Sequence, residues 1–187
     1  RALETLKEVD FILAEDTRVT KKLLSHFNIE KATLSYHQHS SPQKAINLLK
    51  EGKSLALVSD SGTPGISDPG EKLVASVIEE GFEVVPVPGP SALTAAASVS
   101  GFSVDKFLFL GFPPAKKKRQ KFFEKVTKSE VPVILYESPH RIIKTLKELP
   151  DNSQIVVFRE LTKKFETIYR GNKEEIIKQL NGQVRGE

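Results

Sequence analysis

The 187-residue chain has no cysteine, no methionine and no tryptophan, and only 7% of its residues are aromatic. Without cysteine, it can form neither disulfides nor thiolate metal sites. No apolar run approaches the roughly 18 to 20 residues that a membrane-spanning helix needs. The first ten residues, RALETLKEVD, carry charges throughout and have no apolar signal core. These absences predict a cytoplasmic protein that does not interact with a membrane.

The lack of methionine extends to the first position, which is Arg1. Residues 2–9 have a helical pattern with no strand before them, and the chain stops shortly after a helical pattern over 172–182. We therefore expect a piece of a longer protein, with the first strand and the last strand or strands missing.

The composition is that of a globular protein with a real core, because 39% of the residues are hydrophobic and 28% are charged. The net charge is +4 and the pI is about 9.2. This modest basic excess permits a polyanionic partner without requiring one.

Strand-like and helix-like patterns alternate along the chain, which is typical of an α/β fold with a largely parallel sheet. A break at SVDKF divides the chain into two predicted α/β domains, 1–105 and 106–187. The predicted strands are 11–15, 54–59, 82–88, 131–137, 154–160 and 166–171, with one more inside 103–121. The predicted helices are 2–9, 17–27, 41–52, 71–81, 91–101, 116–128, 140–149 and 172–182.

Polar and glycine-rich segments follow the carboxyl ends of the predicted strands, where α/β proteins bind ligands. Five such loops are expected to line one cleft: 16–18, 60–70, 88–92, 137–141 and 160–166. Each has a purely structural alternative. Asp16 can cap the helix that follows it, PGPSA and ESPHR are good helix starts, and Glu137 can simply pair with Arg141.

The stretch VSDSGTPGISDPG, residues 58–70, is the hardest of these loops to explain as a plain turn. A strand-to-helix connection needs only about two to six residues, and this one is rich in residues that allow unusual backbone angles. It lacks the spacing of a phosphate loop or a Rossmann nucleotide site, and no GxSxG nucleophile motif is present. We expect it to hold a ligand by another route.

Two further motifs are ambiguous. His37 and His39 in YHQHS share a face if the segment is extended, but two histidines without a third ligand are weak evidence for zinc. The basic run at 116–121, KKKRQK, is equally typical of a nucleic-acid contact and of a solvated helix face.

Seven motifs in order carry a family resemblance over nearly the whole chain: AEDTR, YHQHS, ALVSDSGTPGISDPG, PVPGPSALTAA, FLFLGF, LYESPHRI and RELTKKFE. Together they resemble the ribosomal RNA small subunit methyltransferase I branch of the tetrapyrrole (corrin/porphyrin) methylase superfamily. The resemblance implies two α/β domains with S-adenosylmethionine in the cleft between them, a homodimer, and 2′-O-methylation of a cytidine in 16S rRNA of the small ribosomal subunit. It also implies an opening strand and a Gly-Pro loop that this chain does not contain.

Residue by residue, the resemblance implies a cofactor-binding set from both domains. Its members are Asp60, Ser61, Gly62, Thr63, Pro64, Ile66, Ser91, Ala92, Tyr136 and Ser138.

A ribose hydroxyl is a poor nucleophile at neutral pH, so a carboxylate base near it would help by about 10² to 10⁴. Glu15, Asp16 and Glu137 follow predicted strands and are the candidates. The candidates for RNA phosphates are Arg18, Lys116, Lys117, Lys118, Arg119, Arg141 and Lys163.

Two other functions stay open from the residues alone. The same fold could methylate a tetrapyrrole or another small molecule, which would not need the basic run. Alternatively, the chain could be a non-catalytic RNA-binding module, which would not bind S-adenosylmethionine.

Overall fold

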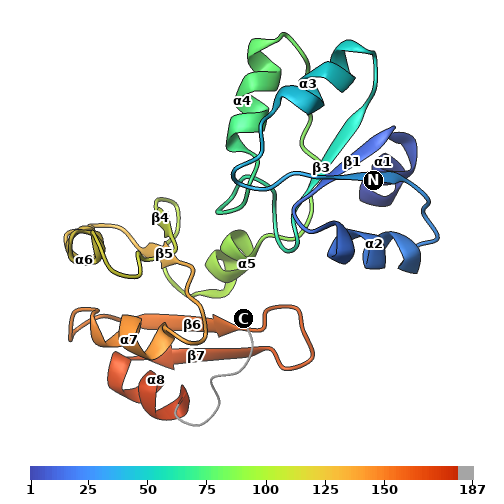
Figure 1. Ribbon diagram of the computed structural model, residues 1–187. Coiled ribbons are helices and arrows are strands. Elements are labelled where there is room, and N and C mark those ends of the chain that lie inside the picture. The colour runs from blue at the N-terminus through green and yellow to red at the C-terminus, as the bar shows by residue number, and fades with distance from the viewer. Residues whose placement is uncertain (181–187) are drawn as a thin grey trace. The chain divides into compact units, whose positions relative to one another are not determined.

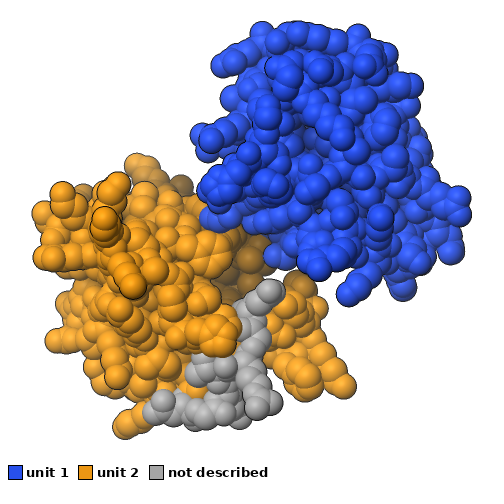
Figure 2. All heavy atoms as spheres, in the orientation of Figure 1, with its two compact units in different colours: residues 1–91 blue, residues 92–187 orange. Residues whose placement is uncertain are grey.

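The computed structural model describes residues 1–180 (Figure 1). The chain divides into two compact units, residues 1–91 and 92–187 (Figure 2). The boundary expected after residue 105 falls inside the second unit. Among the described residues, no helix is long and apolar enough to cross a membrane.

Unit 1 is built on a parallel three-stranded sheet in the order β2-β1-β3. The central strand has the apolar sequence FILA and is the most deeply buried of the three, as expected for a parallel strand covered on both faces. The elements of this unit are α1 (Ala2–Glu8), β1 (Phe11–Ala14), α2 (Thr17–His26), β2 (Ala32–Ser35), α3 (Gln43–Lys50), β3 (Leu55–Val58) and α4 (Glu71–Glu79).

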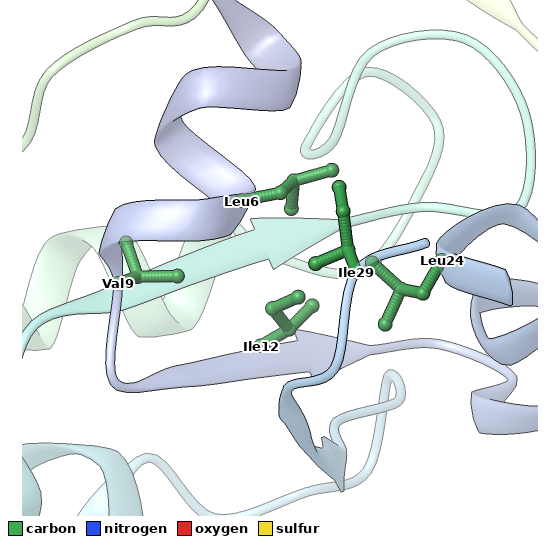
Figure 3. Close-up of a cluster of buried hydrophobic side chains, with 5 residues drawn as sticks. All are labelled: Leu6, Val9, Ile12, Leu24 and Ile29. Atoms are coloured by element: carbon green, nitrogen blue, oxygen red, sulfur yellow. The ribbon is translucent and has the colours of Figure 1, made fainter. Parts of the chain in front are cut away.

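Successive residues of β1 point to opposite faces of the sheet, and helices cover both faces. Ile12 packs with residues of α1 and α2 and of the segments that follow them (Figure 3), namely Leu6, Val9, Leu24 and Ile29. Leu13 packs on the other face with residues from α3 and α4 and with the residue that follows β2, namely Tyr36, Ala45, Leu73 and Val77. The α/β alternation of strands and helices that the sequence predicts is confirmed in this unit.

The strand predicted over 82–88 is wrong. Residues 82–90 have no regular secondary structure, and β3 is an edge strand of its sheet. Val84, Val85 and Val87 are 43%, 53% and 37% exposed. The physical reason is that the segment contains two prolines, at positions 86 and 88, which have no N–H to donate to a strand ladder.

Unit 2 contains a parallel pair of strands, β4 and β5, and an antiparallel pair, β6 and β7. Its main core is formed by α7, α8 and β7 through Leu146, Tyr169, Ile176 and Leu180. The elements are α5 (Ala92–Val99), β4 (Leu108–Gly111), α6 (Arg119–Thr127), β5 (Val133–Leu135), α7 (Ile142–Lys147), β6 (Ile155–Arg159), β7 (Thr167–Gly171) and α8 (Lys173–Leu180).

The helix predicted over 116–128 begins three residues later than expected, at Arg119. Lys118 has a left-handed backbone, with φ of 66°, and is the residue before the first turn. Lys116, Lys117 and Lys118 therefore precede α6, and only Lys121, at the end of the basic run, lies within it. The end of the helix predicted over 172–182 lies outside the described residues.

Candidate functional site

The carboxyl ends of β1, β2 and β3 meet at one edge of the sheet in unit 1. Ala14 is in register with Ser35 on one side and with Val58 on the other, and the backbone N–H of Tyr36 donates to the carbonyl of Ala14 at 2.8 Å. The segments that follow these strands carry AEDTR, YHQHS and VSDSGTPGISDPG. The structure therefore brings together three segments that are far apart in the sequence.

Asp16 connects two of these segments. Its backbone N–H donates to Oδ1 of Asp60 at 3.2 Å, and its carboxylate caps α2 by accepting from the N–H of Arg18 at 2.8 Å. The Arg18 guanidinium also donates to both carboxylate oxygens, at 2.6 to 3.2 Å. These bonds hold the pKa of Asp16 at about 2, because they favour the ionised form. Asp16 is therefore a poor proton acceptor.

Asp68 is another carboxyl group at this edge, besides Glu15, Asp16 and Asp60. It is not among the candidate site residues predicted from the sequence. Burial raises its pKa, and so do the negative charges of Glu15 and Asp60, while a hydrogen bond from Ser59 acts in the opposite direction. A carboxyl group whose pKa is raised in this way is a better general base than Asp16. The signal that could have found it is its place in SDPG, at the far end of the glycine-rich loop.

The glycine-rich loop has the backbone that its sequence predicts. Gly62 and Gly65 have φ of 70° and 81°, a region that side chains with a Cβ rarely occupy. A Cβ built on either glycine meets nothing within 4 Å. The backbone of the loop is therefore open to a ligand at Gly62 and Gly65.

Thr63 joins this loop to the PGPSA segment, the other predicted cofactor segment of the unit. Its hydroxyl donates to the carbonyl of Pro90 at 3.0 Å, directly before Ser91. Ile66, whose N–H donates to the carbonyl of Thr63 at 3.2 Å, is 41% exposed. Two of the predicted cofactor segments, Ser61–Ile66 and the turn before Ser91, thus lie side by side.

Close packing makes glycine necessary at Gly70, which sequence reasoning did not single out. Its φ is 151°, and a Cβ there would lie 3.0 Å from Cδ2 of Leu57 and 3.3 Å from the backbone nitrogen of Gly65. Gly70 therefore lets the end of the loop pack against Leu57 of β3 and against the middle of the loop at Gly65 before α4 starts.

In unit 2, Glu137 is the centre of a buried polar cluster. Its side chain is 4% exposed and accepts from the Arg141 guanidinium at 2.6 Å, from the N–H of Ser138 at 2.8 Å and from the hydroxyl of Thr145. Arg141 also donates to the carbonyl of Pro113 at 2.9 Å. With both oxygens occupied, Glu137 is an anchor for its loop, and we withdraw it as a candidate base.

Arg119 must also be reassigned, from RNA contact to this cluster. Its side chain is 8% exposed and donates to Glu148 at 2.8 Å, to the carbonyl of Pro114 at 2.9 Å and to the hydroxyl of Thr145 at 2.7 Å. A guanidinium that is this deeply buried and makes three hydrogen bonds inside the protein is poorly placed to contact a phosphate. We therefore remove Arg119 from the RNA-binding candidates.

The remaining basic candidates differ in their surroundings. Lys116, Lys117 and Lys118 are exposed, and none of them forms an ion pair with another described residue. Lys116 and Lys118 border a hollow of about 410 Å³ at the start of α6. Lys163 pairs with Glu160 at 3.3 Å. The three lysines are the better candidates for an external anion.

Tyr136 and Ser138 flank Glu137 after β5. The Tyr136 ring packs against Phe109 and Phe112, with centroids 5.0 and 5.5 Å apart, and its N–H donates to the carbonyl of Gly111 at 3.0 Å. The loop is thus fixed to β4 by both backbone and ring contacts. Cofactor binding by Tyr136 and Ser138 stays a prediction.

Comparison with known proteins finds several relatives that share one name. The chain is 46% identical to ribosomal RNA small subunit methyltransferase I of Halalkalibacterium halodurans, over 95% of this chain and 64% of the relative. It is 45% identical to the protein of that name from Thermotoga maritima, over 95% of this chain and 82% of the relative. The Bacillus subtilis protein of that name is 46% identical, over 100% and 67% of the two chains. The chain thus spans about two thirds of the length of most of these relatives.

Solved structures share the fold. A cobalt precorrin-4 methyltransferase of cobalamin biosynthesis superimposes with a TM-score of 0.65 at 18% identity, over 98% of this chain and 84% of that one. The methyltransferase CobJ gives a TM-score of 0.65 at 17% identity, over 92% and 79% of the two chains. The expected tetrapyrrole methylase-like α/β fold is confirmed.

A family model covers nearly the whole chain. The model of the tetrapyrrole (corrin/porphyrin) methylases matches residues 1–177. The chain belongs to the tetrapyrrole (corrin/porphyrin) methylase family.

Proposed function

We propose that this chain is the catalytic part of an S-adenosylmethionine-dependent methyltransferase that acts on the RNA of the small ribosomal subunit, at the 2′-hydroxyl of a cytidine. The names of relatives that are 43 to 49% identical support the RNA substrate. The observation that carries the proposal is the hydrogen bond from Thr63 to Pro90, because it brings together two segments that the family resemblance assigns to the cofactor.

The residues of unit 1 fit S-adenosylmethionine. Gly62 and Gly65 leave their backbone open, so that a ligand can approach and hydrogen-bond it. Asp60 and Asp68 put negative charge beside the loop, which suits a ligand with a sulfonium and an ammonium group. When bound, this cofactor supplies a methyl group that is already activated for transfer.

The protein's own part is mainly alignment, since holding two reactants in line supplies much of the rate. Asp60 keeps the glycine-rich loop next to Asp16 through the 3.2 Å hydrogen bond. We assign the proton from the ribose hydroxyl to a carboxylate at this edge. Glu15 remains a candidate because it forms no hydrogen bond or ion pair with another described residue, and Asp68 joins it. Asp16, held by Arg18, is the weakest of the three.

The exposed lysines Lys116, Lys117 and Lys118 are proposed to hold RNA phosphates, with Arg18, Arg141 and Lys163 in secondary parts because each already has a partner. A cytoplasmic location and a homodimer belong to the same proposal.

The direct test is transfer of a tritiated methyl group from S-adenosylmethionine by the full-length protein. Small ribosomal subunits from a strain that lacks the gene should be labelled at one ribose, and a porphyrinogen should not be labelled. Labelling of the porphyrinogen alone would favour the small-molecule methyltransferase. Binding of RNA without any affinity for S-adenosylmethionine would favour the RNA-binding module.

A further inference from the structure

A second hollow lies at the same edge of unit 1, after β2. It has a volume of about 300 Å³, at the lower end of the range for small-molecule sites. Its floor is formed by apolar residues of β1, β2 and α3, and its rim by the YHQHS segment and the first turn of α3. The lining residues are Leu13, Leu34, Ser35, Tyr36, His37, Ser40, Ser41, Lys44 and Ala45.

Tyr36 is the most informative of these residues. It is 5% exposed, and its hydroxyl has no hydrogen-bond partner among the described residues. Yet no fully buried side-chain oxygen or nitrogen in this part of the chain lacks a partner, so the hydroxyl must reach solvent. Tyr36 lines the hollow, so the hollow offers the hydroxyl a route to solvent. Burial raises the pKa of Tyr36, which keeps the hydroxyl protonated and able to donate.

The other polar groups at the rim are also donors. The Oγ of Ser40 accepts from the N–H of His37 at 3.0 Å, and the Oγ of Ser41 accepts from the N–H of Gln43 at 3.2 Å, so both hydroxyl protons remain free. Nδ1 of His37 accepts from the N–H of His39 at 3.4 Å, which places the ring proton on Nε2.

Lys44 completes the donor set. It is exposed and pairs with no carboxylate of the described residues. It lies in the first turn of α3, which contains no acidic residue, although a cation is unfavourable at the positive end of a helix dipole. No carboxylate lines the hollow. The hollow therefore presents one positive charge and several donors to a ligand, and no negative charge.

This donor set argues against the metal considered for His37 and His39. Nδ1 of His37 is already an acceptor, and residues 1–180 contain no group of three or more potential metal ligands. An apolar ligand would leave the buried Tyr36 hydroxyl without a partner, which costs about 1 to 3 kcal/mol. An anion with an apolar body fits both the rim and the floor.

We propose that this hollow binds one nucleotide of the RNA substrate, with its phosphate on Lys44, His37 and the Tyr36 hydroxyl and its sugar or base on the apolar floor. This inference rests on the proposed function, because it takes RNA as the substrate. The N–H of Tyr36 bonds to Ala14, the residue before Glu15 and Asp16, so the nucleotide would lie beside the candidate bases. The hollow would then fix the position of the RNA strand for methyl transfer.

The test uses three variants of the full-length protein. Lys44→Ala removes the charge, and Tyr36→Phe removes only the hydroxyl. Lys7→Ala is the matched control, because Lys7 is an exposed lysine of α1, which leads into the amino end of β1. Each is assayed for KM and kcat with small ribosomal subunits, for S-adenosylmethionine affinity, and for binding of a short single-stranded oligocytidylate.

We expect Lys44→Ala to raise the KM for subunits by about 10-fold and Tyr36→Phe by about 5-fold, as for a charged and a neutral hydrogen bond. Lys44→Ala should reduce the slope of log affinity for oligocytidylate against log salt by about 0.7, the value for one phosphate contact on a single strand. S-adenosylmethionine affinity and the Lys7→Ala control should be unchanged.

The inference is overturned if Tyr36→Phe and Lys44→Ala keep the wild-type KM and salt slope, or if Lys7→Ala weakens RNA binding as much as Lys44→Ala. If the wild-type protein labels no subunit, the proposed function fails. In that case the hollow is judged by oligocytidylate binding alone, so the two failures can be told apart.

Discussion

The hydroxyl of Thr63 donates to the carbonyl of Pro90 at 3.0 Å, across 27 residues of sequence. This bond ties the glycine-rich loop to the turn that leads into α5. It depends on one hydroxyl group, so its contribution can be measured by removing that group alone.

Thr63→Val keeps the size of the side chain and removes the donor. We expect S-adenosylmethionine to bind about 5- to 10-fold more weakly, in line with the net value of one hydrogen bond, since the two segments would no longer be held together. Thr63→Ser keeps the hydroxyl and should bind normally. Calorimetric titration measures both. Equal affinities of Thr63→Val and the wild type would mean that the bond does not organise a cofactor site.

Gly70 and Gly52 offer a comparison between crowding and backbone strain. Both have a positive φ, but a Cβ on Gly70 would lie 3.0 Å from Leu57 and one on Gly52 would meet nothing within 4 Å. Gly52→Ala should cost about 1 to 2 kcal/mol of unfolding free energy for the left-handed backbone alone. Gly70→Ala should cost more, because Leu57 must also move. Urea unfolding of the two variants gives the difference, and equal losses would show that the close approach at Gly70 is unimportant.

Arg119 and Lys117 lie two residues apart in the basic run, but we expect Arg119 to stabilise the fold and Lys117 to bind RNA. Arg119→Met should destabilise the protein by about 3 kcal/mol or more, since it removes the positive charge that lies 4.0 Å from the buried Glu137 and a hydrogen-bond donor to the buried Thr145. Lys117→Met should leave the melting temperature unchanged and weaken RNA binding, with a smaller dependence on salt. Thermal melts and RNA titrations at several salt concentrations distinguish them. A stable Arg119→Met variant that has lost RNA affinity would return Arg119 to the RNA-binding set.

Asp16 and Asp68 should give opposite dependences of stability on pH. The pKa of Asp16 is lowered to about 2 from an ordinary value of 3.8. Its contribution to stability is therefore fully present above pH 3.8 and is lost as the pH falls toward 2. The pKa of Asp68 is raised, so the folded state loses stability as the pH rises from 3.8 through that raised value.

Asp16→Asn should flatten the acid limb of a plot of urea midpoint against pH, and Asp68→Asn should raise the midpoint at neutral pH. A lower midpoint for Asp68→Asn at neutral pH would contradict the burial of its charge.

The elements that the sequence predicted well are those whose pattern is local. The periodicity of α3 and α4 and the apolar runs of β1 and β3 depend on residues close together in the chain. The strand over 82–88 failed because pairing needs a neighbour, which the pattern FEVVPVP does not reveal. Likewise, nothing in KKKRQK distinguishes Arg119 from its neighbours, since its burial comes from Thr145 and Glu148, more than 25 residues away. The role of Gly70 also depends on contact with a distant residue, Leu57.

The central claim is that the loop around Gly62 holds the cofactor, and one pair of variants tests it most directly. Gly62 and Gly52 have φ of 70° and 79°, and a Cβ on either meets nothing within 4 Å, so Gly62→Val and Gly52→Val impose similar strain. Gly52 follows α3, before the amino end of β3, and Gly62 follows its carboxyl end. Calorimetric titration of S-adenosylmethionine into the full-length variants should show loss of binding for Gly62→Val, near-normal binding for Gly52→Val, and similar melting temperatures for the two. Normal cofactor affinity in Gly62→Val would contradict the account.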